Sequence, residues 1–88
     1  MEKYVYLVSV KYPDMTERLS VFAEEERAKH RLSEKLEEII EEGNAVAPPD
    51  ELRKKFNEKD RRYFVVFVRN NSGIKKVIVG SVGKKVLN

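Results

Sequence analysis

Two stretches decide the fold of this chain: YVYLVSVKY at residues 4–12 and YFVVFVRN at residues 63–70. A strand with one face in water normally alternates apolar and polar side chains. Both stretches are instead apolar at odd and at even positions, so each one reads as a strand that is covered on both faces. We therefore predict that they form the middle of a sheet.

The residues that follow the first stretch indicate a hairpin and a long helix. Pro13 and Asp14 are turn residues, and the chain then returns through an alternating edge strand that ends at Phe22. Over residues 23–43 apolar positions recur at helical spacing, and Gly43 can adopt the left-handed conformation that ends a helix. The apolar stripe consists of Ala28, Leu32, Leu36, Ile39 and Ile40.

The second half of the chain indicates a short helix and another hairpin. Asp50 can cap a helix over residues 50–57, in which Leu52 and Phe56 share one face. The turn sequence NNSG at residues 70–73 joins the second apolar stretch to a returning edge strand, which gives a hairpin over residues 62–80. Because two glycines break the pattern, we expect residues 81–88 to be a basic tail that frays.

The predicted fold is a single α+β domain over residues 1–88, in the order ββααββ. Four antiparallel strands in the order 2-1-3-4 pack on one main helix, with residues 1–22 as the first hairpin and a short second helix. We expect the long helix to cover Val5, Leu7, Phe64, Val66 and Val68. The opposite face of the sheet then carries the aromatic side chains of Tyr4, Tyr6, Tyr12, Tyr63 and Phe67.

Composition narrows the classes of function. The chain has 88 residues and no cysteine, and its one histidine, His30, leaves too few ligands for a zinc site. A chain of this size rarely encloses a deep substrate cavity, so we expect a non-enzymatic module without catalytic residues, cofactor, metal or small-molecule substrate. No stretch approaches the roughly 18 apolar residues of a membrane span, and no secretory signal pattern is present. We expect no membrane partner and a cytoplasmic location.

Three local patterns could carry chemistry, but a structural interpretation is favoured for each. His30 lies among cationic neighbours and is expected to face solvent. The glutamates at positions 34–42 indicate a solvated helix face rather than a cation site, because Ca²⁺ and Mg²⁺ need ligands that converge from a loop or from several elements. The run GSVGKK at residues 80–85 has the wrong spacing for a phosphate-binding loop.

A charged fraction of 38% without glutamine is typical of proteins from hot environments, although chance can produce it in a short chain.

The distribution of charge separates the two halves of the chain. Residues 1–44 contain seven Lys and Arg against eleven Asp and Glu, whereas residues 45–88 contain eleven against four. Such a basic half can contact the phosphates of nucleic acid, or it can pair internally with the acidic long helix. Our candidate phosphate-contacting residues are Arg53, Lys54, Lys55, Arg61, Arg62, Lys75 and Lys76.

The aromatic face admits three occupants. Single-stranded nucleic acid stacks its bases on exposed aromatic rings that have basic neighbours, and Tyr4, Tyr6, Tyr63 and Phe67 are the candidate stacking residues. The short helix could cover the face instead, or two subunits could bury it together. We expect a small binding module whose basic half contacts nucleic acid or an assembly that contains it. The alternative is a protein-interaction module, a homodimer through the sheet, without nucleic-acid binding.

Overall fold

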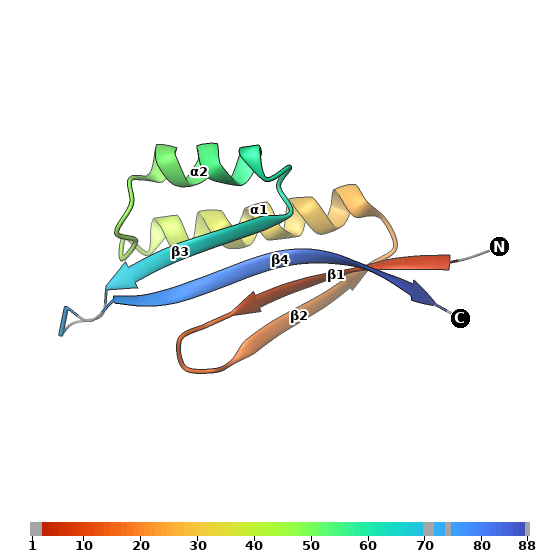
Figure 1. Cartoon of the computed structure of the whole chain (residues 1–88), viewed down its shortest axis with the longest axis horizontal. Helices are drawn as coiled ribbons and strands as arrows, with labels where there is room; N and C mark the ends of the chain where they lie inside the picture. Colours follow the sequence, from red (N-terminus) through yellow and green to blue (C-terminus); the bar gives the residue numbers. More distant parts are fainter. Residues whose placement is uncertain (1–2, 70–71, 74, 88) are drawn as a thin grey trace.

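The computed structural model describes residues 3–69, 72–73 and 75–87, and it shows a four-stranded antiparallel sheet with both helices on one face (Figure 1). The elements are β1 (Lys3–Lys11), β2 (Glu17–Phe22), α1 (Glu25–Glu41), α2 (Pro49–Glu58), β3 (Tyr63–Arg69) and β4 (Lys75–Leu87). The predicted α+β class and the ββααββ order are confirmed. The predicted turn at residues 70–73 includes Asn70 and Asn71, which lie outside the described residues, as do Ile74 and Asn88.

The strand order is β2-β1-β4-β3, so the predicted order 2-1-3-4 is wrong in its last two strands. β4 pairs with β1 from Lys11↔Val79 to Lys3↔Leu87 and with β3 from Arg69↔Lys75 to Tyr63↔Ser81. The segment that we expected to fray therefore continues β4 along β1 as far as Leu87. β4 is the longest strand, and it pairs with β3 over residues 75–81 and with β1 over residues 79–87.

The core lies between the sheet and α1. The helical stripe is buried as predicted at Ala28, Leu32, Leu36 and Ile39, while Ile40 is half-buried. The strands contribute Val8, Val10, Phe64, Val66 and Ile78 to the same cluster. Each such side chain stabilises the fold by about 1.5–3 kcal/mol relative to an exposed position. No helix among the described residues is long and apolar enough to cross a membrane.

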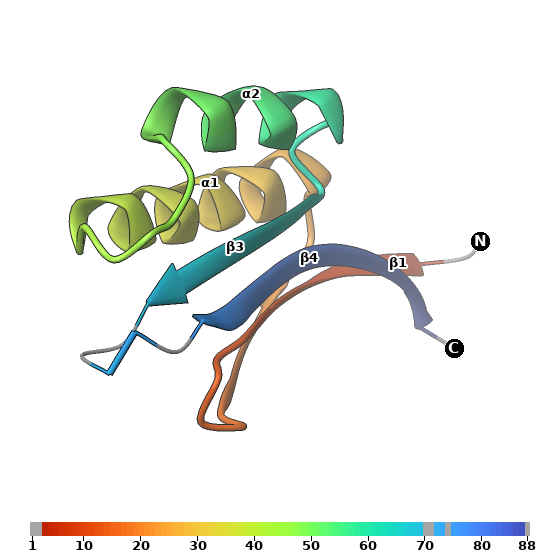
Figure 2. The same ribbon diagram turned by 60° about the vertical axis from the view of Figure 1, so that its left-hand side comes forward.

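α2 packs on the same side of the sheet as α1. It begins at Pro49, a residue suited to the first turn because it lacks the N–H that a helix start leaves unpaired. Leu52 and Phe56 are buried, and the rings of Phe56 and Phe64 meet edge to face with centroids 6.0 Å apart. Figure 2 shows both helices on the same side of the sheet, with α2 above α1 in this view. Within the described residues, no helix lies over the opposite face of the sheet.

Candidate functional site

The candidate site is the face of the sheet opposite the helices, which we call the open face. Because side chains alternate between the faces of a strand, the residues between the buried ones belong to it. Cross-strand pairing aligns these residues: Leu19 lies opposite Ser9, Ser9 opposite Ser81, and Ser81 opposite Tyr63. The apolar side chains of the open face are Val5, Leu7, Leu19, Val21, Tyr63, Val65, Phe67, Val77, Val79 and Leu87.

Large apolar side chains are exposed at both edges of the open face. On β3 the exposed fraction is 43% for Tyr63 and 55% for Phe67, and on β2 it is 58% for Leu19 and 63% for Val21. Groups of exposed apolar side chains on one face of a monomeric protein often mark a binding surface. The open face is therefore the strongest candidate for a binding surface.

The charges on the open face are mostly positive. The cations at these positions are Lys3, Lys11, Arg69, Lys75 and Lys85, and the register also places Glu17 there. None of these cations takes part in an ion pair within the described part of the chain. Glu17 accepts a hydrogen bond from Ser9 Oγ at 2.6 Å. With no carboxylate partner in the described part of the chain, these cations can attract an anionic ligand.

The face assignment predicted for β1 is wrong. Tyr6 and Tyr12 pack against the core on the helix side, and the register puts Tyr4 on that side too, with Lys84 Nζ 4.0 Å from the centre of its ring. Val5 and Leu7 lie on the open face instead of under α1. Since both faces of this strand are apolar, its pattern could not fix which one meets the helix. Of the candidate stacking residues, the open face therefore carries Tyr63 and Phe67.

Several of the candidate phosphate-contacting residues pair with acids of the helices. Arg53 forms a two-point contact with Glu37, at 2.7 Å from Nε to Oε1 and 3.0 Å from Nη2 to Oε2. This contact lowers the pKa of the Glu37 carboxyl and raises the pKa of the Arg53 guanidinium. Lys55 pairs with Glu51 at 3.1 Å.

The same pairing occurs at the other end of α1. Arg61 contacts Glu26 at 3.1 Å, and Arg62 contacts Glu25. Three of the candidate residues, Arg53, Arg61 and Arg62, therefore pair with acids of α1, which supports internal pairing with the acidic helix for these three. Lys55 instead pairs within its own helix. No ion pair within the described residues involves Lys54, Lys75 or Lys76.

The predicted phosphate-contacting residues do not share one face. Lys75 belongs to the open face, whereas Lys76 lies opposite Val68 on the helix side. There it lines a shallow depression of about 960 Å³ with three further cations, Arg18, Arg31 and Lys35. The candidate residues predicted from the sequence do not include Lys11 and Lys85. Lys11 lies opposite Val79, which lies opposite Val65 between the two exposed rings, and Lys85 lies on β4 opposite Val5. Their spacing from the aromatic residues becomes visible only when the strand order is known.

No metal-binding arrangement is found within the described residues. No group of three acidic or imidazole side chains could hold a metal ion there. His30 is exposed, with Nε2 3.6 Å from Glu34 Oε1. The run GSVGKK lies within β4 and is extended, so its backbone does not form a loop that could surround a phosphate. Comparisons with protein-family models, curated proteins and solved structures find no match for this chain.

Proposed function

We propose that this protein is a non-enzymatic binding module that holds single-stranded nucleic acid on the open face of its sheet. The observation that carries the proposal is the exposure of two rings, Tyr63 and Phe67, on a sheet face without a covering helix. Unpaired bases stack on such rings regardless of sequence, because every base has an aromatic face. A duplex keeps its bases stacked internally, so single strands are the favoured ligand.

Unpaired cations on the open face support the same proposal. Lys75 and Lys85 lie ten residues apart on β4, a separation of roughly 33 Å along an extended strand. Lys11, on β1, lies opposite Val79, between these two lysines, and Arg69, on β3, lies opposite Lys75. Together these side chains can neutralise about four phosphates of a strand that crosses the sheet. The phosphate-contacting residues proposed here are the cations of the open face instead of those on and beside α2. Lys75 is the one residue that also belongs to the set predicted from the sequence.

The direct test is an anisotropy titration of fluorescein-labelled oligonucleotides of about 16 nucleotides, single-stranded and duplex. We expect the single strand to bind more tightly. Neutralisation of about four phosphates predicts that raising the salt concentration from about 50 to about 200 mM weakens binding roughly 50-fold. Absence of binding to either oligonucleotide at the lower salt concentration contradicts the proposal.

A matched pair of charge reversals locates the binding surface. Lys85→Glu acts on the open face, whereas Lys54→Glu makes the same change on α2, away from it. We expect Lys85→Glu to weaken single-strand binding by at least about tenfold, since it removes one phosphate contact and adds a repulsive charge. Lys54→Glu should have a much smaller effect. The reverse result would support the α2 segment as the nucleic-acid surface.

A second candidate function is self-association through the open face. It is favoured by the aliphatic side chains of Leu19 and Val21, which are exposed on β2 and are poor ligands for bases or phosphates. A stable dimer buries about 800 Å² on each partner, and it would cover these residues. Sedimentation equilibrium without nucleic acid tests this candidate. A dimer mass that persists at micromolar concentration, with no oligonucleotide binding, would favour self-association over the first proposal.

A further inference from the structure

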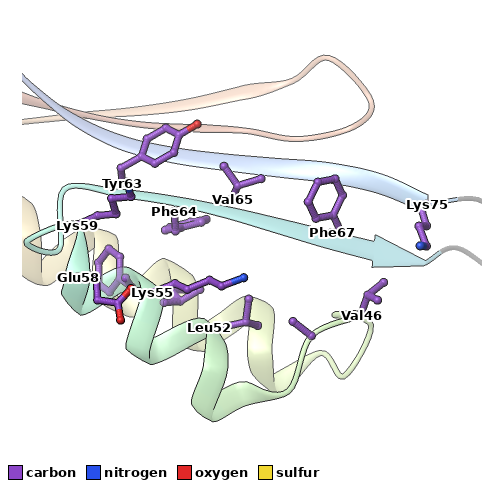
Figure 3. Close-up of a pocket in the computed structure, with 13 residues that line it drawn as sticks. Val46, Leu52, Lys55, Glu58, Lys59, Tyr63, Phe64, Val65, Phe67 and Lys75 are labelled. Atoms are coloured by element: carbon purple, nitrogen blue, oxygen red, sulfur yellow. The ribbon is translucent and has the colours of Figure 1, made fainter.

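A groove runs between α2 and the outer edge of β3, with a volume of about 580 Å³. Figure 3 shows Leu52 and Lys55 on the helix side, and Val65 and Phe67 on the strand that forms the opposite side. Leu52 and Phe56, which line the groove, also belong to the buried core, so its helix side rests on rigidly packed residues. We call this feature the α2–β3 groove.

Part of the β3 edge in this groove has no strand beside it. Residues 44–46 pair with the far end of β3: Val46 N–H donates to the Phe67 carbonyl at 2.8 Å, and Arg69 N–H donates to the Asn44 carbonyl at 3.0 Å. Odd-numbered residues of β3 thus direct their backbone groups away from β4, as antiparallel pairing requires. Within the described residues, the outward N–H and C=O groups of Val65 have no such partner.

The rim of the groove is basic. Lys55, Lys59 and Lys75 line it together with one acid, Glu58. Lys55 contacts Glu51 on its own helix, while Lys59 and Lys75 form no ion pair within the described residues. This charge favours an acidic ligand. It also disfavours a second copy of the chain at this edge, because each copy would bring the same lysines to the contact.

We propose that the α2–β3 groove binds an extended acidic peptide, which adds to the edge of β3 as a further strand. Backbone hydrogen bonds to Val65 would supply part of the affinity, and alternate apolar side chains of the peptide would contact Leu52 and Phe56. Its acidic side chains would face the lysines at the rim. The groove and the proposed nucleic-acid surface overlap at Tyr63, Phe67 and Lys75, which line the groove and also belong to the open face. The contacts that belong to the groove alone are those with α2 and with the outward backbone groups of Val65.

The probe is a fluorescein-labelled peptide of sequence Asp-Val-Asp-Leu-Asp-Val-Asp, titrated into the whole chain. We expect saturable binding, together with slower amide hydrogen exchange at Val65 in NMR spectra. A peptide with lysine in place of each aspartate should bind at least about tenfold more weakly. Equal binding of the two peptides, or unchanged exchange at Val65 on saturation, would overturn the proposal.

Removing the outward N–H group of Val65 tests whether the peptide adds to β3 as a strand. Val65→Pro removes the outward N–H without removing a hydrogen bond to β4, and edge strands accept proline at such positions. It should weaken peptide binding about tenfold, while Val65→Ala, which keeps the N–H, should change it by less than about threefold. If Val65→Pro does not fold, the same loss is expected for the unmodified protein with a peptide N-methylated at alternate residues. Unchanged binding in these experiments would overturn the proposal.

Charge-reversal variants distinguish binding in the groove from binding on the rest of the open face. Lys59→Glu, at the residue that follows α2, should weaken binding of the acidic peptide, and Lys54→Glu, on α2 but outside the groove, should leave it unchanged. Lys85→Glu should weaken oligonucleotide binding while leaving peptide binding intact. Weakening of peptide binding by Lys85→Glu and not by Lys59→Glu would show that the peptide binds the open face, and would overturn the proposal.

Discussion

The ring of Phe64 lies directly over Gly80, its cross-strand partner. A Cβ atom at Gly80 would lie 2.4 Å from Cε2 and Cζ of Phe64, and 2.8 Å from Cδ1 of Leu32. Both distances are below any that real Cβ atoms show, so the absence of a side chain at Gly80 is what lets Phe64 reach the core beneath α1. A glycine that interrupts the strand pattern in the sequence is thus a packing requirement of the central strand.

Gly80→Ala should therefore destabilise the protein. The added methyl group must displace the Phe64 ring or the Leu32 side chain, and overpacking of this kind costs about 1–3 kcal/mol. The free energy of unfolding in urea measures the effect. Gly83→Ala is the matched control in the same strand, because no atom lies within 4 Å of its Cβ position. It should be neutral or stabilising by up to about 1 kcal/mol, and equal losses for the two variants would contradict this account.

The fold class could be predicted from the sequence, but the strand order could not. The stripe of α1 and the pair Leu52 and Phe56 have helical spacing, so burial followed from periodicity alone. The apolar residues on both faces of β3 predict a central position for this strand. In the structure it is an edge strand, whose covered side packs on the helices and whose outer edge is partly paired with residues 44–46. Apolar faces report burial above and below a strand, and they do not report neighbours beside it.

The candidate site was predictable only in part, for a related reason. The predicted position of Tyr63 and Phe67 opposite the long helix agrees with the structure, in which Phe64 and Val66 belong to the core on the helix side. The sequence of β1 could not show which of its faces meets the helices, because tyrosine can pack on the margin of a core and keep its hydroxyl near water. The ion pairs of Arg53 and Arg61 depend on the approach of α2 to α1 and are separated by 16 and 35 positions along the chain. Local sequence patterns do not encode such contacts.

The exposed ring of Phe67 should contribute to single-strand binding. Replacement by alanine removes one stacking surface, which is worth about 1–3 kcal/mol per base and corresponds to a loss of affinity of about 5- to 150-fold. Tyr4→Ala is the control, because it removes an aromatic ring from the helix side of the sheet. The oligonucleotide titration should show little change for that variant. A larger loss for Tyr4→Ala than for Phe67→Ala would exclude the open face as the stacking surface.

Lys29 should make stability depend on pH at both extremes. Its ammonium group is buried and lies 3.1 Å from Asp60 and 3.3 Å from Glu25. The hydrogen bond to Asp60 raises the pKa of Lys29 despite burial, and it lowers the pKa of Asp60. Burial by itself would raise the pKa of the Glu25 carboxyl, but hydrogen bonds from Lys29 and Arg62 lower it below the ordinary value.

The signs of these shifts fix the expected pH profile. A carboxyl with a lowered pKa stabilises the fold above its ordinary value, 3.8 for Asp60, and this contribution is lost as the pH falls through the lower folded value. The Lys29 contribution is complete below 10.5 and is lost as the pH rises through the raised folded value. Asp60→Asn should therefore reduce the melting temperature at neutral pH, and the difference from the parent should shrink in acid.

Glu58→Gln provides the control for that pH profile. Glu58 lies near the same loop but forms no ion pair within the described residues, so its replacement should leave the melting temperature nearly unchanged. If the difference between Asp60→Asn and the parent stays constant from neutral pH to below 3.8, the ion pair with Lys29 does not stabilise the fold. A constant difference would assign the effect to local backbone changes at Asp60, whose φ is 55°.

Leu19→Lys separates the two functions proposed for the open face. Leu19 is exposed on the edge strand β2, so the substitution should change stability by less than about 0.5 kcal/mol. An added cation on a nucleic-acid surface should tighten oligonucleotide binding by a few-fold and steepen its salt dependence, because one more phosphate can be neutralised. In a dimer that buries Leu19, the same lysine would place a charge in an apolar contact and convert the dimer to monomer. Anisotropy and sedimentation measured on this one variant therefore give opposite results for the two functions.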